Sequence, residues 1–351
     1  MPARPDGDGR NVHGRDGGGD GGGDAHGSDG GGDGGGDNRG RGDSTAALQL
    51  PAPGKINRYL RVLGRREDGF HEIETQFQFI AWADRLTFEA LDSPQIRRID
   101  RHDFALPAED LCVRAARLLQ AECPTAAGRG ALITARKTIP PGSGLGGGSS
   151  NAATTLLALN RLWQLGLPRD RLAELGLRLG ADVPLFVRGR AALARGIGEK
   201  LTPQTPAEKY LCICIPAAVS TARVFAEFRP ADCGNRDNSG SGDAAGRGDN
   251  SGNSGNLDNS SDHGESDAAA PTGNDLESAA TRLYPAIGDA LAQLRSRGMN
   301  AHLTGSGGAI FAEFNSRAEA NRAAAALPNH LPARVTPTLN RHPLADFGIR
   351  P

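Results

Sequence analysis

The stretch Pro140-Pro-Gly-Ser-Gly-Leu-Gly-Gly-Gly-Ser-Ser150 runs directly into Asn151-Ala-Ala-Thr-Thr-Leu-Leu-Ala-Leu-Asn-Arg-Leu-Trp163. Glycine permits tight backbone turns and leaves room for a ligand to approach the amide groups. The second stretch has apolar residues at helical spacing, and the first amides of a helix lack internal partners and lie at the positive end of its dipole. The pattern therefore predicts a loop that binds an anion, such as a phosphate chain, at a helix N-terminus.

Other kinds of glycine-rich segment fit this stretch less well. No Gly-Lys-Ser/Thr closes it, so it is not a Walker A loop. Gly142, Gly144 and Gly147 satisfy the dinucleotide pattern G-x-G-x-x-G, but residues 160–167 lack the carboxylate that such a site uses to hold a ribose. A flexible Gly/Ser linker would have no reason to end on Ser-Ser-Asn ahead of a helical pattern.

Two segments of the chain have too few apolar residues to form a core. Residues 1–46 are rich in glycine, aspartate and arginine, and residues 234–273 in asparagine, serine, glycine and aspartate. Neither can bury enough apolar surface to offset the entropy of ordering, so both are expected to be disordered. The rest of the 351 residues is enough for an N-terminal domain over 47–200 and a C-terminal domain over 201–351 that contains the acidic insert.

Charge and hydropathy exclude several classes of partner. A formal net charge of −1 leaves no basic footprint for nucleic acid, and no apolar run is long enough to span a membrane. The N-terminus lacks the apolar core of a signal peptide, and five cysteines without CxxC spacing are typical of a reducing compartment. We therefore expect a cytoplasmic protein without an obligate protein partner. Cys212 and Cys214 should be buried on one face of a strand.

Helical and strand patterns alternate without the regular rhythm of a doubly wound sheet, which predicts the α+β class. The predicted strands are 73–81, 84–90, 131–138, 210–215 and 310–314, and the predicted helices are 111–121, 151–165, 169–179, 276–297 and 317–327. Pro168 and Gly180 flank the third helix as start and stop signals.

Three further motifs accompany the glycine-rich loop: Pro51-Ala-Pro-Gly-Lys-Ile-Asn57 with Gly69-Phe-His71, Leu179-Gly-Ala-Asp-Val-Pro-Leu-Phe186, and Leu303-Thr-Gly-Ser-Gly-Gly-Ala309. With them the chain resembles the superfamily of galactokinases, homoserine kinases, mevalonate kinases and phosphomevalonate kinases (GHMP kinases). Within it, the chain resembles most the 4-diphosphocytidyl-2-C-methyl-D-erythritol kinases of the non-mevalonate isoprenoid pathway. The resemblance covers residues 50–232 and 271–347, and it implies a two-domain α+β fold with the active site between the domains.

The resemblance implies an ATP-dependent kinase that phosphorylates the 2-hydroxyl of a cytidylyl sugar-alcohol, with Mg²⁺ expected beside ATP. It makes Asp182 the acceptor of the hydroxyl proton and Lys55 the cation that keeps this carboxylate ionised. Considered without the resemblance, Asp182 could equally be a turn or cap residue ahead of Pro184, and Lys55 a solvated lysine. The ATP-binding residues would be Pro140, Pro141, Gly142, Ser143, Gly144, Leu145, Gly146, Gly147, Gly148, Ser149 and Ser150.

By the same resemblance, the small-molecule substrate would be bound by Asn57, Phe70, His71, Thr221 and Phe225, with the base between the two phenylalanines and His71 hydrogen-bonded to it. Asp110 stands where the family often has an asparagine near the adenine. Two other functions remain open. One is a homoserine-type or mevalonate-type kinase, which has no use for an aromatic clamp. The other is a non-catalytic nucleotide-binding or scaffold protein, which has no use for a proton acceptor.

Overall fold

Two long antiparallel strands, β1 (Leu48–Arg65) and β2 (His71–Leu91), are paired along most of their length. The structure is a computed structural model and describes residues 47–233 and 273–348, all within one compact unit. A tight turn joins the two strands. In it Gly69 has a φ of +86°, and the Asp68 carboxylate accepts a hydrogen bond of 3.1 Å from the amide of Phe70. The left-handed conformation at this position is the one that glycine adopts most readily.

The remaining strands extend this pair into one mixed sheet. They are β3 (Ile96–Asp100), β4 (Gly130–Arg136), β5 (Ala192–Arg195), β6 (Lys200–Pro203), β7 (Tyr210–Cys214), β8 (Ala301–Leu303), β9 (Ile310–Phe314) and β10 (Ala333–Leu339). The order through the described strands is β3-β4-β2-β10-β7-β9-β8, with β1 and β5 also paired to β2 and β6 paired to β5. The last strand along the chain, β10, therefore links β2 to β7.

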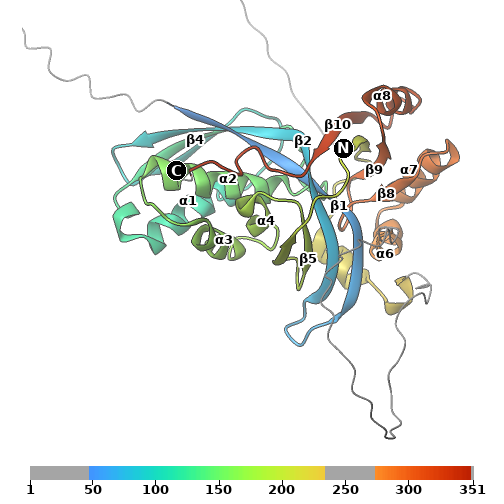
Figure 1. The fold of residues 1–351 in the computed structure, drawn as a ribbon, viewed down its shortest axis with the longest axis horizontal. Helices are drawn as coiled ribbons and strands as arrows, with labels where there is room; N and C mark the ends of the chain where they lie inside the picture. The colour runs from blue at the N-terminus through green and yellow to red at the C-terminus, as the bar shows by residue number, and fades with distance from the viewer. Residues whose placement is uncertain (1–46, 234–272, 349–351) are drawn as a thin grey trace, which may run out of the picture. The chain divides into compact units, whose positions relative to one another are not determined.

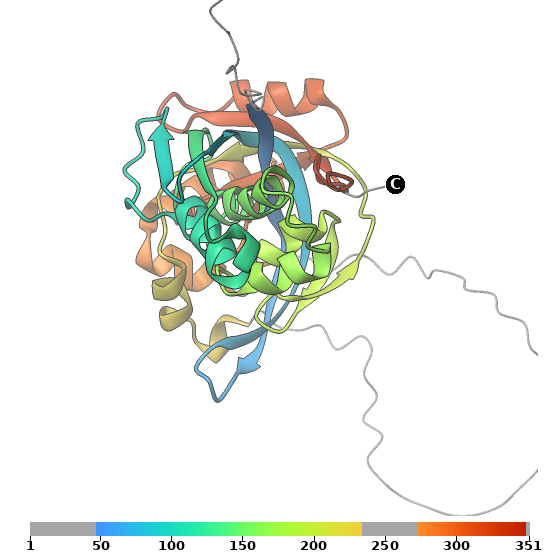
Figure 2. The same ribbon diagram turned by 90° about the vertical axis from the view of Figure 1, so that its left-hand side faces the viewer.

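The helices form two groups: one packs with the part of the sheet around β1, β2 and β4, and the other with the part formed by β7 to β10. Those packed against β1, β2 and β4 are α1 (Leu111–Glu122), α2 (Gly147–Leu162), α3 (Arg169–Leu177) and α4 (Val183–Arg188), all on one face (Figure 1) and in front of the long strands in Figure 2. The others are α5 (Thr221–Glu227), α6 (Glu277–Leu283), α7 (Pro285–Ser296) and α8 (Arg317–Ala325), and 3-10 turns lie at Pro124–Ala126 and Pro230–Asp232. None of the described helices is long and apolar enough to cross a membrane.

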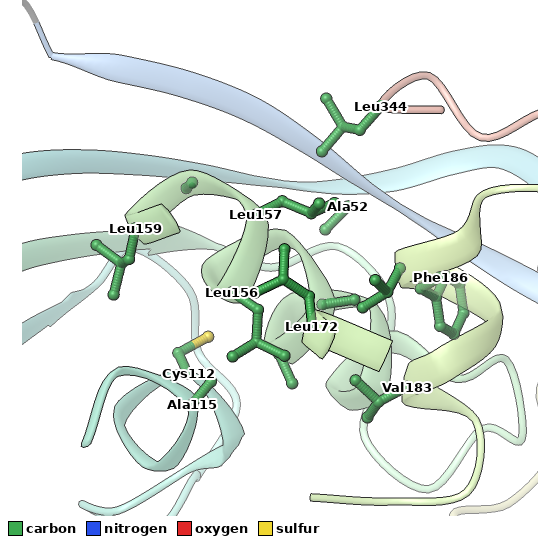
Figure 3. Close-up of a cluster of buried hydrophobic side chains, with 14 of the residues drawn as sticks. Ala52, Cys112, Ala115, Leu156, Leu157, Leu159, Leu172, Val183, Phe186 and Leu344 are labelled. Carbon is green, nitrogen blue, oxygen red and sulfur yellow. The ribbon is translucent and has the colours of Figure 1, made fainter. Parts of the chain in front are cut away.

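Helix α2 lies at the centre of the larger apolar core. Its side chains Leu156 and Leu157 are almost fully buried, between Ala52 of β1, Cys112 of α1 and Val183 of α4 (Figure 3). A helix that is buried on most of its sides is held by its neighbours, so the direction in which it points is fixed by packing. The core therefore fixes the direction in which the N-terminus of α2, with the glycine-rich loop, points.

The α+β class is confirmed, and most predicted elements are present with shifted ends. Two predictions were wrong. The strands expected at 73–81 and 84–90 are the single strand β2, because the buried carboxylate of Asp84 is fully hydrogen-bonded instead of ending the strand. The helix expected over 276–297 is broken at Tyr284, because Pro285 lacks an amide donor and begins α7.

Further expectations concern the start of α2, the burial of two cysteines, and the two polar segments. Helix α2 begins at Gly147, four residues before the predicted start, and Cys212 and Cys214 are buried on β7 as expected. The glycine-rich tail (1–46) and the acidic insert (234–273), except Gly273, lie outside the described residues. The division of the chain at 200/201 stays a prediction.

The C-terminal segment 340–348 returns from β10 to the helices. Its backbone is bonded to the chain after α4, where Ala191 donates to Asn340 (2.8 Å) and His342 donates to Gly189 (3.0 Å). The Arg169 guanidinium of α3 donates to the carbonyls of Leu344 and Val187, which ties this segment to α4. The closing segment thus holds the helix that follows Asp182.

His342 in this segment is buried against aromatic rings, and its pKa is lowered to about 3 by loss of solvation and by the nearby Arg169 charge. In the unfolded chain a histidine titrates near 6.5, so below that pH the unfolded state takes up a proton that the folded state refuses. We expect this group alone to cost about 2 kcal/mol of unfolding free energy between pH 6.5 and pH 5. Unfolding of wild type and His342→Gln at both pH values measures it, and equal losses in the two proteins would contradict the assignment.

Candidate active site

The glycine-rich loop adopts a series of left-handed turns before α2. The φ angles of Gly142, Gly144 and Gly146 are +70°, +76° and +70°, a region that other L-residues adopt only with strain. Gly146 stands at the N-cap of α2, where no side chain caps the first amides. These amides and the positive end of the helix dipole therefore remain available to an anion.

Three distant segments hold the loop by backbone hydrogen bonds. The amide of Lys55 donates to Leu145 O (2.9 Å), that of Ala309 to Ser143 O (2.7 Å), and that of Val219 to Gly142 O (2.8 Å). The backbone of the loop 140–150 lies closer to that of the glycine-rich segment 303–309 than a side chain between them would permit. A Cβ atom on Gly144 would lie 2.5 Å from the carbonyl oxygen of Gly307.

Most of the predicted ATP-binding residues line one cavity of about 570 Å³, and three of them do not. The lining residues are Pro140, Pro141, Gly142, Gly144, Gly146, Gly147, Gly148 and Ser149. Ser143, Leu145 and Ser150 are buried, and Leu145 packs into a small apolar core with residues of β1, β2, β7 and β9.

Lys55 and Asp182 meet in the same cavity. Lys55 comes from β1 and is almost buried, and its Nζ lies 3.3 Å from the Asp182 carboxylate, whose side chain is 28% exposed. Asp182 occupies the N-cap position of α4, but its side chain makes no capping hydrogen bond. The carboxylate is therefore paired with a buried cation and open to the cavity, which is unlike an ordinary helix cap.

Asn57 also lines this cavity, but its side chain is committed to neighbours. Its Oδ1 accepts from Lys55 Nζ (2.8 Å), and its Nδ2 donates to the Thr75 hydroxyl (2.9 Å). Its backbone amide donates to the hydroxyl of Thr304 at 2.8 Å. Asn57 thus fixes the direction of the Lys55 ammonium group, and it connects this group to the third motif.

A second cavity of about 1000 Å³ adjoins the first, with Thr221 and Phe225 lining both. The imidazole of His71 stacks on Phe225 at 5.2 Å between ring centroids and meets the edge of Phe228 at 5.7 Å. Phe70 lines the same cavity and is 59% exposed. Burial, and secondarily the charge of Arg65, lowers the pKa of His71, so its ring is neutral at neutral pH.

Sequence reasoning missed several residues that line these cavities. Phe228 was missed, although it follows Phe225 by one helical turn, a spacing that could have revealed it. Ser306 was missed as well, and its hydroxyl lies 2.8 Å from that of Thr221. Lys137 and Asn151 line the first cavity too, and no motif in the sequence marks Lys137 as part of it.

Asp110, where the family often has asparagine, caps α1. Its carboxylate accepts from the amides of Cys112 (3.0 Å) and Val113 (3.1 Å) and pairs with Arg98. Asparagine and aspartate are about equally good N-caps, so the exchange preserves this role.

Among the described residues, no group of three His, Cys, Asp or Glu side chains could hold a metal ion. The first cavity contains the Lys55–Asp182 pair beside the first amides of α2, which no side chain caps. That combination suits the transfer of a phosphoryl group, because such a transfer needs positioning and charge stabilisation more than covalent chemistry.

Comparison with known proteins agrees with this geometry. The family models for "GHMP kinases N terminal domain" and "GHMP kinases C terminal" match residues 110–190 and 256–333. A 4-diphosphocytidyl-2-C-methyl-D-erythritol kinase of Pseudomonas aeruginosa (strain LESB58) is 43% identical over 286 residues, which covers 81% of this chain and 91% of the relative. The chain belongs to the 4-diphosphocytidyl-2-C-methyl-D-erythritol kinase family. It is therefore an ATP-dependent small-molecule kinase.

Solved structures agree with membership of this kinase family. A crystal structure of 4-(cytidine 5'-diphospho)-2C-methyl-D-erythritol kinase matches with a TM-score of 0.65 and 32% identity, over 83% of this chain and 99% of the other. A homoserine kinase from Cytophaga hutchinsonii matches with a TM-score of 0.58 but only 15% identity, over 84% of this chain and 95% of the other. This second likeness shows that the GHMP kinase fold is shared and says nothing of the substrate.

Proposed function

We propose that the chain transfers the γ-phosphoryl group of ATP to the 2-hydroxyl of 4-diphosphocytidyl-2-C-methyl-D-erythritol, a step in non-mevalonate isoprenoid precursor synthesis. The observation that carries the proposal is the Lys55–Asp182 pair in the first cavity, where the neighbouring Ala181 also lines the second cavity. One cavity is lined by the phosphate-binding loop and the other by aromatic rings, so the pair lies between a nucleotide donor and a base-containing acceptor.

In the proposed reaction, Asp182 accepts the proton of the attacking hydroxyl. Its carboxylate is open to the cavity and lies 3.3 Å from the Lys55 ammonium group, so it is placed to receive the proton of a bound hydroxyl. The ammonium group of Lys55, oriented by Asn57, also stabilises the charge that develops on the transferred group. The free amides at the start of α2 bind the phosphates and keep the γ-phosphorus in line with the hydroxyl.

The cytosine base would bind in the aromatic cavity. A pyrimidine that stacks on Phe225 would take the place of the His71 imidazole, which is then free to hydrogen-bond the edge of the base. Phe70, which is largely exposed, has room to cover the other face of the base. The neutral state of His71 suits this role, since one ring nitrogen donates and the other accepts.

Mg²⁺ would enter with ATP. Because the described residues offer no cluster of acidic ligands, the ion would be held chiefly by phosphate oxygens and water, as is usual for Mg²⁺ in nucleotide sites. The Ser149 hydroxyl and the Asp182 carboxylate both line the cavity and fit such a donor set, whereas the Ser150 hydroxyl is buried. The ion would neutralise charge on the β- and γ-phosphates.

The rival acceptors are homoserine and mevalonate, which have no base to stack. The experiment that tests the proposal measures ADP release with ATP and each of three acceptors: the cytidylyl substrate, homoserine and mevalonate. We expect turnover with the cytidylyl substrate alone. Turnover with homoserine or mevalonate at a higher kcat/KM would overturn the assignment of the acceptor.

Loss of the aromatic clamp should affect the acceptor and spare the donor. Phe225→Ala and His71→Ala are expected to raise KM for the cytidylyl substrate by roughly tenfold, since stacking of a base on an aromatic ring contributes about 1–3 kcal/mol. KM for ATP should stay within about twofold of wild type. Steady-state kinetics with each substrate varied in turn measures both values. An equal rise in KM for ATP would mean that the nucleotide occupies the aromatic cavity.

We also propose that the protein works in the cytoplasm. All five cysteines are free, and burial raises the pKa of Cys112, Cys212 and Cys214 to between about 11 and about 12. Free thiols of this kind are typical of a reducing compartment.

A further inference from the structure

A cluster of three buried polar side chains lies beneath the phosphate-binding loop. Asp84 of β2 is 1% exposed, Asn151 of α2 is 3% exposed, and Lys137, just after β4, is 8% exposed. The Lys137 ammonium group donates to the Asp84 carboxylate and to Asn151 Oδ1 (2.7 Å). None of these contacts involves Lys55 or Asp182, so the cluster is separate from the catalytic pair.

The Asp84 carboxylate connects both ends of the loop. Its Oδ1 accepts from the amides of Thr138 (2.6 Å) and Ile139 (2.8 Å), which immediately precede the loop. Its Oδ2 accepts from Asn151 Nδ2 (3.0 Å), which immediately follows the loop on α2, as well as from Lys137. One side chain on β2 thereby fixes the distance between the residues where the loop 140–150 begins and ends.

Stability alone does not explain such a cluster. Burying an ion pair costs solvation energy, and well-packed apolar residues of the same volume often stabilise a protein at least as well. An ion pair with a full set of hydrogen bonds instead fixes the positions of the groups around it, because each donor can bond to the carboxylate only from one direction. The position of α2 relative to the end of β4, and hence the shape of the loop, depends on that geometry.

We propose that Asp84 and Lys137 are positioning residues for ATP, which hold the loop 140–150 in the conformation that binds phosphate. The inference rests on the proposed role of this loop in binding the nucleotide. Asp84 does not line the cavity, whereas Lys137 and Asn151 do. A change at Asp84 therefore reaches the nucleotide only through the loop, which makes Asp84 the better residue to test.

The test is the affinity for ADP, measured by calorimetry without an acceptor. Asp84→Asn replaces one carboxylate oxygen, which accepts hydrogen bonds, with an NH₂ group, which can only donate them. Lys137→Met removes the ammonium group and keeps the length of the side chain. Each is expected to weaken ADP binding by roughly tenfold and to raise KM for ATP equally, with kcat at saturating ATP within about twofold. The double variant should lose about as much as either single variant, because the two residues act through one cluster.

A matched control separates positioning from general loss of stability. Leu291→Ala removes a buried side chain of α7 that lines neither cavity and belongs to a different apolar core from α2, and it should lower the melting temperature without changing ADP affinity. If either single variant does not fold, the double variant carries the test, because it leaves no buried charge unpaired. Affinity for ADP within twofold of wild type in the folded variants would overturn the proposal, and so would losses that multiply in the double variant.

Binding of ADP does not depend on which acceptor the kinase uses. Failure of the cytidylyl substrate to react, with ADP binding weakened in Asp84→Asn, would reject the acceptor and retain the positioning role. The opposite pattern would reject the positioning role alone.

Discussion

Asp182→Asn is expected to lower kcat at least about a hundredfold, the low end of the contribution of a general base, with ATP affinity and melting temperature near those of wild type. The amide has almost the shape of the carboxylate but cannot take a proton from the acceptor hydroxyl. Asp182 makes no capping hydrogen bond to α4 and is partly exposed, so the substitution should cost little stability. Steady-state kinetics and thermal unfolding measure the two effects.

Three further variants complete this test. Lys55→Ala should be impaired to a similar degree, and the double variant should lose much less than the product of the single losses, because the two groups act as a unit. Asp289→Asn, the same exchange at an exposed position of α7, serves as the control and should leave kcat unchanged. Near-normal turnover in Asp182→Asn would make this aspartate a structural residue.

Gly144→Ala should be the most damaging single change in the loop. Gly144 has a φ of +76°, and a Cβ atom there would lie 2.5 Å from Gly307 O and 2.8 Å from Thr304 O, which are backbone atoms that cannot turn away. We expect a loss of about 3 kcal/mol or more in unfolding free energy, the sum of the left-handed backbone cost and the overpacking cost. The two glycine-rich motifs would also move apart, which should raise KM for ATP.

The control for Gly144→Ala is Gly298→Ala. Gly298 has nearly the same φ, +75°, but no atom lies within 4 Å of the position that a Cβ would take. It should therefore lose only the backbone cost, about 1–2 kcal/mol. Chemical denaturation of both variants isolates the close approach of the two motifs. Equal losses would show that the contact between Gly144 and the motif at 304–308 can relax at no cost.

Local signals in the sequence were enough to predict elements whose ends are marked by nearby residues. The strand at Ile310–Phe314 was predicted residue for residue, and α3 begins at Arg169 as the preceding proline indicated. The glycine-rich turns ahead of α2 were predicted for the same reason, since glycine spacing and the following helical periodicity are properties of one short stretch. These features depend on residues that are close together in the sequence, so a sequence pattern is enough to predict them.

Features that depend on distant partners were missed. Asp84 has no local sign of its role, because its hydrogen-bond partners come from residues 137–139 and 151. The sequence also led to the prediction that Asn57 faces the substrate, which stays a prediction; its hydrogen bonds to Lys55 and Thr75 carry no sign in the sequence. The pairing of Lys55 with Asp182 could be inferred only from the resemblance, since 127 residues separate them and no spacing rule links a strand to a helix so far along the chain.

The position of β10 has a consequence for how the protein is made. This strand pairs with β2 at Phe79 and Ile80 and with β7 through Ala333 to Pro337, and it leaves the ribosome after both of the strands that it joins. Until then, β2 and β7 have edges without a partner, and unpaired edges are sites of aggregation. The segment 340–348, which holds α4, emerges later still, so the helix that follows Asp182 is held in place only after β10 has been made. A premature stop before β10 would therefore yield an inactive chain with unpaired, aggregation-prone strand edges, and not an enzyme of reduced activity.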